Sequence, residues 1–436
     1  MISNIETKFK ETEIGTLPEE WDILPLGEVA ESISDTFKFN GDEVVFLNTG
    51  DILEGKILNH NLFNPDLLPG QAKKRIKKDD ILFSEIRPAN KRFAYIDFDG
   101  SDYVVSTKLM VIRAKSSILP KYLYVVLTSP EMLNTFQVLA ESRSGTFPQI
   151  TFEAISSTPL PLPNIVEQER LSEFILTLDE KIELNRQINS NLEKLASALF
   201  KHWFVDFEFP DNDGKPYKSS GGKMVDSELG EIPVGWKVVQ LNELADVIDC
   251  LHSKKPKRLE ENTDNVLLQL DNVKDDGLLD LTTKYYICDA DYKKWISRIE
   301  ASEGDCIITN VGRVGAFSRI PANIKAALGR NMTGIRCKLS FPYHFYLAQY
   351  FLSDLYKSEV SKNMDVGTIL DALNVKNIPK LRLLFPPKQI LDMANNIFES
   401  IWKLREQNKL SNYYLSDARN YLLPRLMSGK IRVNNL

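Results

Sequence analysis

Two parts of the sequence concentrate lysine and arginine in a chain that is acidic as a whole. Residues 73–115 hold 11 Lys and Arg against 6 Asp and Glu, and residues 284–336 hold 9 against 5, although the net charge of the 436 residues is −6. Cationic side chains contact phosphates, and arginine or asparagine also hydrogen-bonds to guanine or adenine edges. An ordinary solvated charge is the alternative for each residue. The candidate DNA contacts are Lys73, Lys74, Arg75, Arg87, Lys91, Arg92, Lys254, Lys257, Arg258, Asn310, Arg313 and Arg330.

Motifs for catalysis are absent from the sequence. It contains no phosphate-binding G-x-x-x-x-G-K-[ST], no G-x-G-x-x-G, no H-E-x-x-H and no Asn/Asp-Pro-Pro-aromatic tetrapeptide of the kind that amino-methyltransferases use. The acidic run 211–215 is typical of a linker turn, because a calcium loop needs a glutamate at its twelfth position. The sequence therefore predicts a chain that is not an enzyme and that binds no cofactor itself.

Cysteine and histidine usage points to a reduced compartment without a metal site. The cysteines all lie in the second half, at Cys250, Cys288, Cys306 and Cys337, and none forms a C-x-x-C pair. Neither they nor the four histidines have metal-ligand spacing, so we expect no metal and a cytoplasmic location. The N-terminus lacks the apolar centre of a signal peptide, and no apolar run approaches 18 residues, so we expect no membrane contact.

A stretch near the N-terminus is repeated 215 residues later. Residues 13–30 and 228–245 share seven identities, including Trp21 and Trp236, and several intervening positions exchange one apolar residue for another. A duplication of this length predicts two similar domains. The two tryptophans are expected to anchor cores, with stacking on a nucleic-acid base as the alternative. Such a chain suits the reading of two half-sites and poorly suits one catalytic pocket.

Short β-branched and aromatic runs follow the repeated start and are typical of strands in an irregular sheet. The runs expected to form strands in the first copy are 44–47, 81–83, 93–96 and 109–112. Two of the surrounding segments recur in the second copy. Residues 80–84 match 305–309, and residues 110–113 match 333–336. The fold class expected is α+β, with two similar mixed α/β domains.

Each copy ends at a proline-marked boundary, after which apolar residues recur every three to four positions for four heptads. This spacing predicts two long helices that form an antiparallel coiled coil, and with it an internal pseudo-two-fold symmetry. The expected organisation is a first domain over 1–163, a first long helix over 164–205, a linker and second domain over 206–385, and a second long helix with a C-terminal tail over 386–428.

One asparagine interrupts the apolar positions of each predicted helix. Asn185 lies midway between Leu171 and Leu199, and Asn408 holds the matching place in the second helix. If the helices run antiparallel with their centres aligned, Asn185 pairs with Asn408. A buried asparagine pair fixes helix register at some cost in stability. The alternative is that each asparagine faces solvent.

The end of the first helix is unusually rich in aromatic residues. Phe200, Trp203 and Phe204 lie within residues 199–207. Two interpretations are open. The cluster is either a docking surface for a partner protein or the base of the second domain.

Four segments together resemble the specificity subunits of Type I restriction-modification systems. They are Pro161–Gln168, Leu199–Phe207, Glu228–Trp236 and Leu422–Gly429. With the duplicated layout, the resemblance covers nearly the whole chain. The chain departs from the pattern at Lys388 and Gln389, where the first copy has the fuller Val-Glu-Gln, and this weakens only the expected start of the second helix.

The resemblance implies that each domain is a target recognition domain that reads one half of a bipartite, asymmetric site in double-stranded DNA. The paired helices would set the spacer and bind two methyltransferase subunits, which carry S-adenosylmethionine and methylate adenine. Restriction subunits driven by ATP, with Mg²⁺, would join for cleavage. The competing interpretations are a coiled-coil scaffold that binds only proteins, and a fused enzyme, which the missing motifs disfavour.

Overall fold

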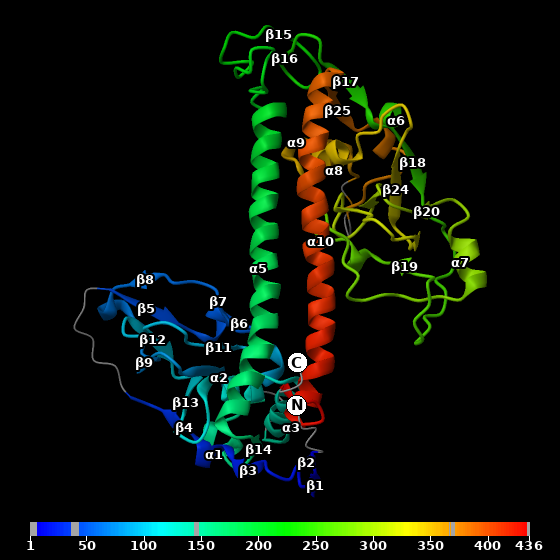
Figure 1. Ribbon diagram of the computed structural model, residues 1–436. Coiled ribbons are helices and arrows are strands. Elements are labelled where there is room, and N and C mark those ends of the chain that lie inside the picture. The colour runs from blue at the N-terminus through cyan, green and yellow to red at the C-terminus, as the bar shows by residue number, and fades with distance from the viewer. Residues whose placement is uncertain (1–6, 36–42, 144–147, 366, 368–370, 434–436) are drawn as a thin grey trace, which may run out of the picture. The chain divides into compact units, whose positions relative to one another are not determined.

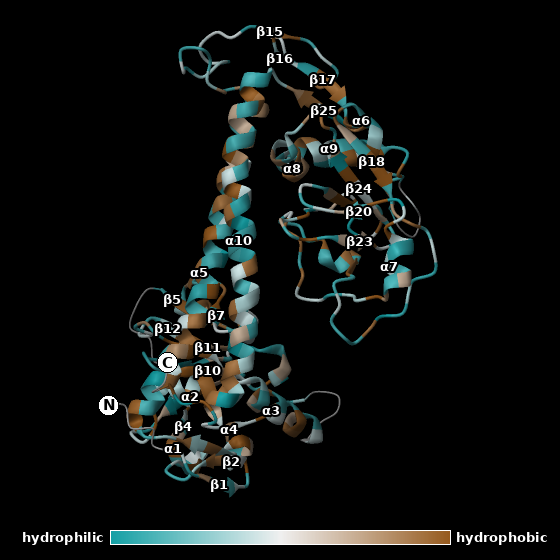
Figure 2. Ribbon diagram, turned by 45° about the vertical axis from the view of Figure 1, so that its right-hand side comes forward, coloured by the Kyte–Doolittle hydropathy of each residue, from teal (hydrophilic) through white to brown (hydrophobic). Residues whose placement is uncertain are grey.

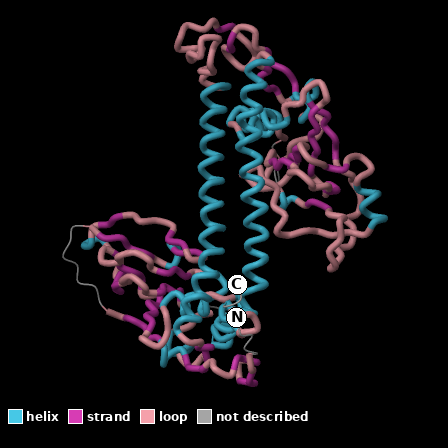
Figure 3. Tube along the Cα trace, viewed as in Figure 1, coloured by secondary structure: helices cyan, strands magenta, loops and turns pink. Residues whose placement is uncertain are grey.

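The structure is a computed structural model that describes residues 7–35, 43–143, 148–365, 367 and 371–433. The chain divides into two compact units (Figure 1). The first unit comprises Met1–Ile182 and Tyr414–Leu436, and the second comprises Glu183–Tyr413. Helices and strands are mixed in both (Figure 3), as the α+β prediction requires. Among the described residues no helix is long and apolar enough to cross a membrane.

The first unit is built mainly from short strands, followed by helices and the beginning of one long helix. Its elements are β1 (Phe9–Thr12), β2 (Gly15–Pro18), β3 (Asp22–Pro25), α1 (Leu26–Val29), β4 (Ala30–Ile33), β5 (Val44–Leu47), η1 (Thr49–Asp51), β6 (Ile52–Leu53), β7 (Lys56–Ile57), β8 (Leu62–Phe63), η2 (Pro65–Leu67), β9 (Ala72–Arg75), β10 (Ile81–Ser84), η3 (Pro88–Asn90), β11 (Phe93–Tyr95), β12 (Tyr103–Ser106), β13 (Leu109–Ala114), α2 (Pro120–Leu127), α3 (Pro130–Arg143), α4 (Phe152–Ile155), β14 (Pro159–Leu162) and the start of α5 (Ile165–Phe204). The expected strand runs of the first copy are thereby confirmed.

The second unit is built in a similar way, from short strands and helices. Its elements are the end of α5, β15 (Met224–Val225), β16 (Ile232–Pro233), β17 (Lys237–Gln240), α6 (Leu241–Leu244), β18 (Ala245–Asp249), β19 (Leu267–Leu268), η4 (Leu270–Asn272), α7 (Asp289–Trp295), β20 (Glu300–Ala301), β21 (Cys306–Thr309), β22 (Phe317–Arg319), β23 (Ala326–Leu328), β24 (Met332–Cys337), α8 (His344–Leu352), α9 (Asp354–Asn363), η5 (Ile378–Lys380), β25 (Arg382–Phe385) and the start of α10 (Lys388–Met427). The last turns of α10 belong to the first unit.

The two units have the same sheet topology. The order β11-β10-β13-β4 in the first unit corresponds to β22-β21-β24-β18 in the second, with every neighbouring pair antiparallel. A further sheet has the order β8-β5-β12-β9 in the first unit and β19-β23-β20 in the second. Its three shared positions are β5-β12-β9 and β19-β23-β20, of which the first pair is parallel in both units. The duplication seen in the sequence is therefore a duplication of the fold.

One ion pair with a buried aspartate recurs at the matched positions of the two sheets. Arg113 Nε donates to Asp80 Oδ1 at 2.7 Å in the first unit, and Arg336 Nε donates to Asp305 Oδ1 at 2.8 Å in the second. Hydrogen bonding to the carboxylate raises the pKa of each guanidinium, so both arginines stay charged. Both aspartates also cap the preceding turn, because they accept from a backbone N–H three residues earlier. A buried acid at the start of the strand thus orders the turn and holds its neighbour.

The apolar core of each unit continues from the sheet onto a long helix (Figure 2). Trp21 is fully buried in the first unit and Trp236 is 5% exposed in the second, so both anchor cores and neither faces a base. The proposed docking surface at the end of α5 is wrong. Phe200, Trp203 and Phe204 are at most 8% exposed, because they pack into the core of the second unit.

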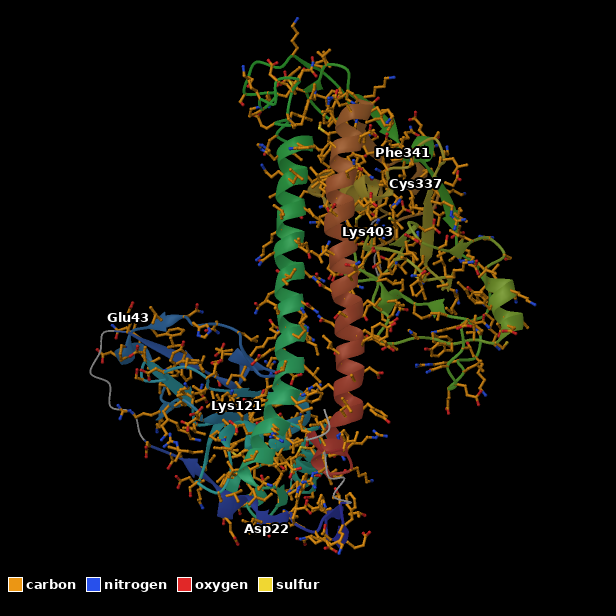
Figure 4. All side chains as sticks on the ribbon, in the orientation of Figure 1. Asp22, Glu43, Lys121, Cys337, Phe341 and Lys403 are labelled. Carbon is orange, nitrogen blue, oxygen red and sulfur yellow. The ribbon has the colours of Figure 1, made fainter. Side chains whose placement is uncertain are left out.

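Cys337 and Phe341, labelled in Figure 4, belong to the same apolar cluster as those aromatics. The equivalent turn of α10 carries Leu423 and Leu426, which are buried in the core of the first unit. Each long helix therefore ends as a structural part of a unit.

The two long helices run antiparallel where they meet, but in a register different from the predicted one. Asn185 Nδ2 donates to Asn412 Oδ1 at 2.8 Å, and Asn408 Nδ2 donates to Asn189 Oδ1 at 2.9 Å. Asn185 is only 2% exposed, so the solvent alternative fails for it. The expected pairing of Asn185 with Asn408 is wrong by one helical turn, because two further asparagines supply the partners.

The compact units do not follow the domain limits expected from the sequence. The helices begin and end within three residues of the expected bounds, at Ile165–Phe204 and Lys388–Met427. Each compact unit, however, takes a part of both helices. The helix ends pack with the sheets, and this divides the chain inside the helices. The domain limits themselves stay a prediction.

Candidate nucleic-acid interface

A cleft of about 460 Å³ lies in the second unit, where the β23–β24 loop meets the turn after β19. The cleft combines positive charge with amide groups and one aromatic wall. It is lined by Lys255, Arg258, Leu267, Gln269, Leu270, Asp271, Asn272, Thr283, Tyr285, Trp295, Gly329, Arg330 and Asn331. Two of the twelve predicted contacts, Arg258 and Arg330, are brought together here. The other ten do not line it.

Backbone hydrogen bonds fix the walls of this cleft. Gly329 N donates to Leu268 O at 2.9 Å, and a Cβ at Gly329 would overlap that carbonyl oxygen, so only glycine allows this approach. Asn331 has a left-handed φ of 64°, and its carbonyl accepts from Asn310 N at 2.9 Å. Gln269 precedes the turn η4 and receives its cap from Asn272, whose Oδ1 accepts from Gln269 N at 2.8 Å. The loop is therefore rigid at both ends.

Two cations and an aromatic ring form another part of the lining. Lys255 Nζ lies 4.5 Å from the centroid of the Tyr285 ring, and the Arg258 guanidinium lies 5.8 Å from it. The Tyr285 hydroxyl donates to Pro256 O at 2.8 Å, which ties the basic segment to the ring. Arg258 also donates to Lys284 O at 3.0 Å. A cation held against a ring keeps its charge and loses little freedom on meeting a phosphate.

Two predicted DNA contacts brace turns instead. Arg92 donates to Gly50 O at 3.1 Å and to Ile52 O at 2.8 Å. Arg313 donates to Val273 O and pairs with Asp275 at 2.9 Å. Both guanidiniums therefore have internal acceptors, and a contact of either residue with DNA stays a prediction.

Two more candidates are held inside their units. Lys74 donates to the carbonyls of Thr107 at 3.1 Å and Leu109 at 2.8 Å, and burial lowers its pKa. Asn310 is 7% exposed, donates to Leu373 O at 3.1 Å and accepts from the Thr333 hydroxyl at 3.1 Å. Lys74 and Asn310 each hold a loop between two strands, so their assignment as direct DNA contacts is corrected.

The other basic candidates lie at the surface. Lys91 pairs with Glu54 at 2.9 Å and is about half exposed. The exposed residues of the set, apart from Lys91 and those of the cleft, are Lys73, Arg75, Arg87, Lys254 and Lys257. Lys73, Arg87, Lys254 and Lys257 lie where phosphates could reach them.

The polar lining residues that the sequence analysis did not predict include Lys255, Gln269 and Asn331. Lys255 is the second residue of a basic run, and only its neighbours were selected. Asn331 follows Arg330 between two strand-like runs, a position where a left-handed asparagine is typical of a tight turn. Gln269 has no sequence signal of its own, because its place depends on strand pairing with residues about 60 positions away.

The sequence spacing also did not indicate a small polar cluster in the second unit. Ligand atoms of Asp249, Cys250 and His252 lie within 4.8 Å of one another. His252 Nε2 lies 2.9 Å from Asp249 Oδ2, and Arg298 donates to the same oxygen at 3.2 Å. The guanidinium already supplies the positive charge at this carboxylate, and burial raises the pKa of the Cys250 thiol, which disfavours the thiolate that metals bind. The cluster is explained as a hydrogen-bonded group.

Comparison with known proteins identifies the family. The model of the Type I restriction modification DNA specificity domain matches residues 18–194. The chain is 33% identical to the Type I restriction enzyme HindI specificity subunit of Haemophilus influenzae, over 94% of this chain and 100% of that protein. It is 24% identical to the MjaIX specificity subunit of Methanocaldococcus jannaschii, over 99% of this chain and 98% of that protein.

A solved structure has the same fold. The Type-I restriction-modification system S subunit from M. genitalium aligns with a TM-score of 0.58 at 12% identity, over 98% of both chains. The scaffold alternative finds no support in these relatives. With two sheets of the same topology and a family match along nearly its whole length, this chain belongs to the specificity subunits of Type I restriction-modification systems.

Proposed function

We propose that this chain recognises a bipartite, asymmetric site in double-stranded DNA, with one compact unit reading each half. The observation that carries the proposal is the pair of sheets with one strand order and different side chains in the equivalent loops. Two similar frames with different polar residues suit two different short sequences. They suit a single catalytic pocket poorly.

The chain acts through partners in this proposal and supplies no catalytic group. Two methyltransferase subunits bring S-adenosylmethionine and methylate adenine, and restriction subunits use ATP and Mg²⁺ to cleave DNA. Helices α5 and α10 form an antiparallel coiled coil that sets the spacer and relates the two recognition domains by pseudo-two-fold symmetry. The place of action is the cytoplasm. Family membership and the cross-helix asparagine contacts support this arrangement.

The test is co-expression with the methyltransferase subunit of the same system, followed by genome-wide mapping of methylated adenine by long-read sequencing. We expect one split motif with two short specified halves around a fixed gap. Replacing residues 228–383 with the same region of a relative should change one half only. A complex that assembles but leaves the genome unmethylated would contradict the proposal and return the scaffold interpretation.

A further inference from the structure

The β23–β24 loop of the second unit has its counterpart in the first unit in the β12–β13 loop. Asn331 O accepts from Asn310 N at 2.9 Å, and Lys108 O accepts from Glu85 N at 3.0 Å, so the same backbone bond holds both loops. The turns beside them are also equivalent, because Gln269 and Asn48 both donate their backbone N–H to the third residue of the turn at 2.8 Å. One backbone frame is therefore present twice.

The side chains on that frame differ between the units. The loop positions carry Arg330 and Asn331 in the second unit, where the first unit has Thr107 and Lys108. The turn position carries Gln269 in place of Asn48. Arginine, asparagine and glutamine are the side chains that make paired hydrogen bonds to base edges. A shared frame with different hydrogen-bonding groups is what two readers of different sequences need.

Arg330 is placed to meet a ligand rather than to support the fold. Its side chain is exposed, and the part of the chain that the structure describes offers its guanidinium no hydrogen bond or ion pair. Arg313 and Arg92, in contrast, donate hydrogen bonds to backbone carbonyls of their own units. Rigid backbone on both sides of Arg330 lowers the entropy lost when the side chain is fixed by a ligand.

The charges around the cleft fit nucleic acid. Lys255, Arg258 and Arg330 face a single acid, Asp271. Lys255 and Arg258 are held at the Tyr285 ring, which also lines the cleft. A backbone phosphate at the two cations would leave the base edges to the amides and to Arg330, which separates affinity from specificity.

We infer that Arg330 and Asn331 are the specificity-determining residues of the second unit, with Arg330 bound to the O6 and N7 acceptors of a guanine. Gln269 supports the loop, because its Nε2 donates to Leu268 O at 3.0 Å. Lys255 and Arg258 hold the adjacent phosphate. Lys108 occupies the position of Asn331 in the first unit. This inference rests on the proposed function, because it assumes that the unit reads a half-site.

The experiment compares methylation motifs of variants in the co-expressed methyltransferase complex. Arg330→Ala should relax one guanine-containing position of one half by about 10- to 100-fold in preference, and leave the other half unchanged. Arg330→Gln should shift that position toward adenine. The matched control Lys257→Ala changes an exposed cation outside the cleft, and should lower methylation equally at all sites. Lys108→Asn should alter only the other half.

The outcomes separate the two proposals. A wild-type complex without a split motif contradicts the proposed function and this inference together. A wild-type split motif that Arg330→Ala and Arg330→Gln leave unchanged overturns the inference alone. Uniform weakening of methylation by both variants also overturns it, and assigns Arg330 to a phosphate contact. Size-exclusion chromatography of each complex establishes that the variants assemble. If Arg330→Ala fails to assemble, the Gln variant and the Lys108→Asn exchange carry the same test.

Discussion

The two units share their sheets but hold the long helices by different chemistry. In the second unit Arg319 pairs with Glu406 of α10, and Arg405, 1% exposed, pairs with Glu193 of α5 at 3.0 Å. In the first unit the segment after α10 holds the long helix, because Arg432 pairs with Glu167 of α5 at 2.5 Å. The two units thus share the sheets and the paired aspartate and arginine, whereas the ion pairs that hold the long helices differ between them.

The buried pair of the second unit should give the largest effect. Glu406→Ala leaves the Arg319 guanidinium, 1% exposed, without its carboxylate, and such a loss costs about 3–5 kcal/mol. The variant is measured by urea unfolding in a Trp21→Phe background, where the remaining tryptophans all lie in the second unit.

Burial raises the pKa of Glu406 although Arg319 opposes the shift, so the pair is costly to bury. The double variant Arg319→Met, Glu406→Leu is therefore expected near wild-type stability, since apolar residues of similar volume replace buried ion pairs at little cost. A double variant as unstable as Glu406→Ala would argue that the pair itself stabilises the unit.

The anchor of the first unit should be next in size. Arg432→Ala removes a donor to Glu167, which is 5% exposed and otherwise accepts from Trp21 Nε1 at 3.0 Å. Hydrogen bonds to charged groups contribute about 1.5–3 kcal/mol, so faster amide exchange is expected in peptides around Trp21. Exposed Lys430→Ala is the matched control. If exchange rose equally in the second unit, the division into two independent anchors would be wrong.

A pH response should distinguish the units further. Burial, and then the nearby Arg319 guanidinium, lowers the pKa of His344, the first residue of α8, to about 4. Helix α2 of the first unit begins with Pro120, which has no titratable side chain. The unfolded chain binds this proton below about pH 6.5 but the folded unit only near pH 4. The free energy of unfolding therefore falls as pH drops through that window.

The measurement is urea unfolding of the second unit at several pH values between 4 and 7, for wild type and His344→Gln. The Gln variant should lose part of the slope, and His202→Gln, an exposed histidine, should keep it. Identical slopes for wild type and His344→Gln would show that other groups cause the response.

Sequence patterns were enough for the repeat and the α+β class, because β-branched runs and the matched Asp80 and Arg113 are local signals. They were not enough to orient the cations. Arg92 is occupied by carbonyls about 40 residues away, and no local pattern reports such an acceptor. The prediction of a docking surface at the aromatic end of α5 was wrong for a similar reason. Whether an apolar helix face is covered depends on the strands that follow it much later in the chain.

Substitutions in the cross-helix asparagine pairs should have the smallest effect on stability. The register also shows what a sequence pattern leaves undetermined. A helical pattern is compatible with helix registers that differ by one turn. The observed register is the one in which Asn185 meets Asn412 and Asn408 meets Asn189. Asn185→Leu alone should destabilise by about 1 kcal/mol, because Asn412 loses its partner. Asn185→Leu with Asn412→Leu should recover or exceed wild-type stability while loosening register. Thermal unfolding of both single variants and the double variant gives the coupling energy, and the exposed Gln187→Leu is the control. Additive single effects would mean that the asparagines do not act as a pair, and that apolar contacts alone set the register.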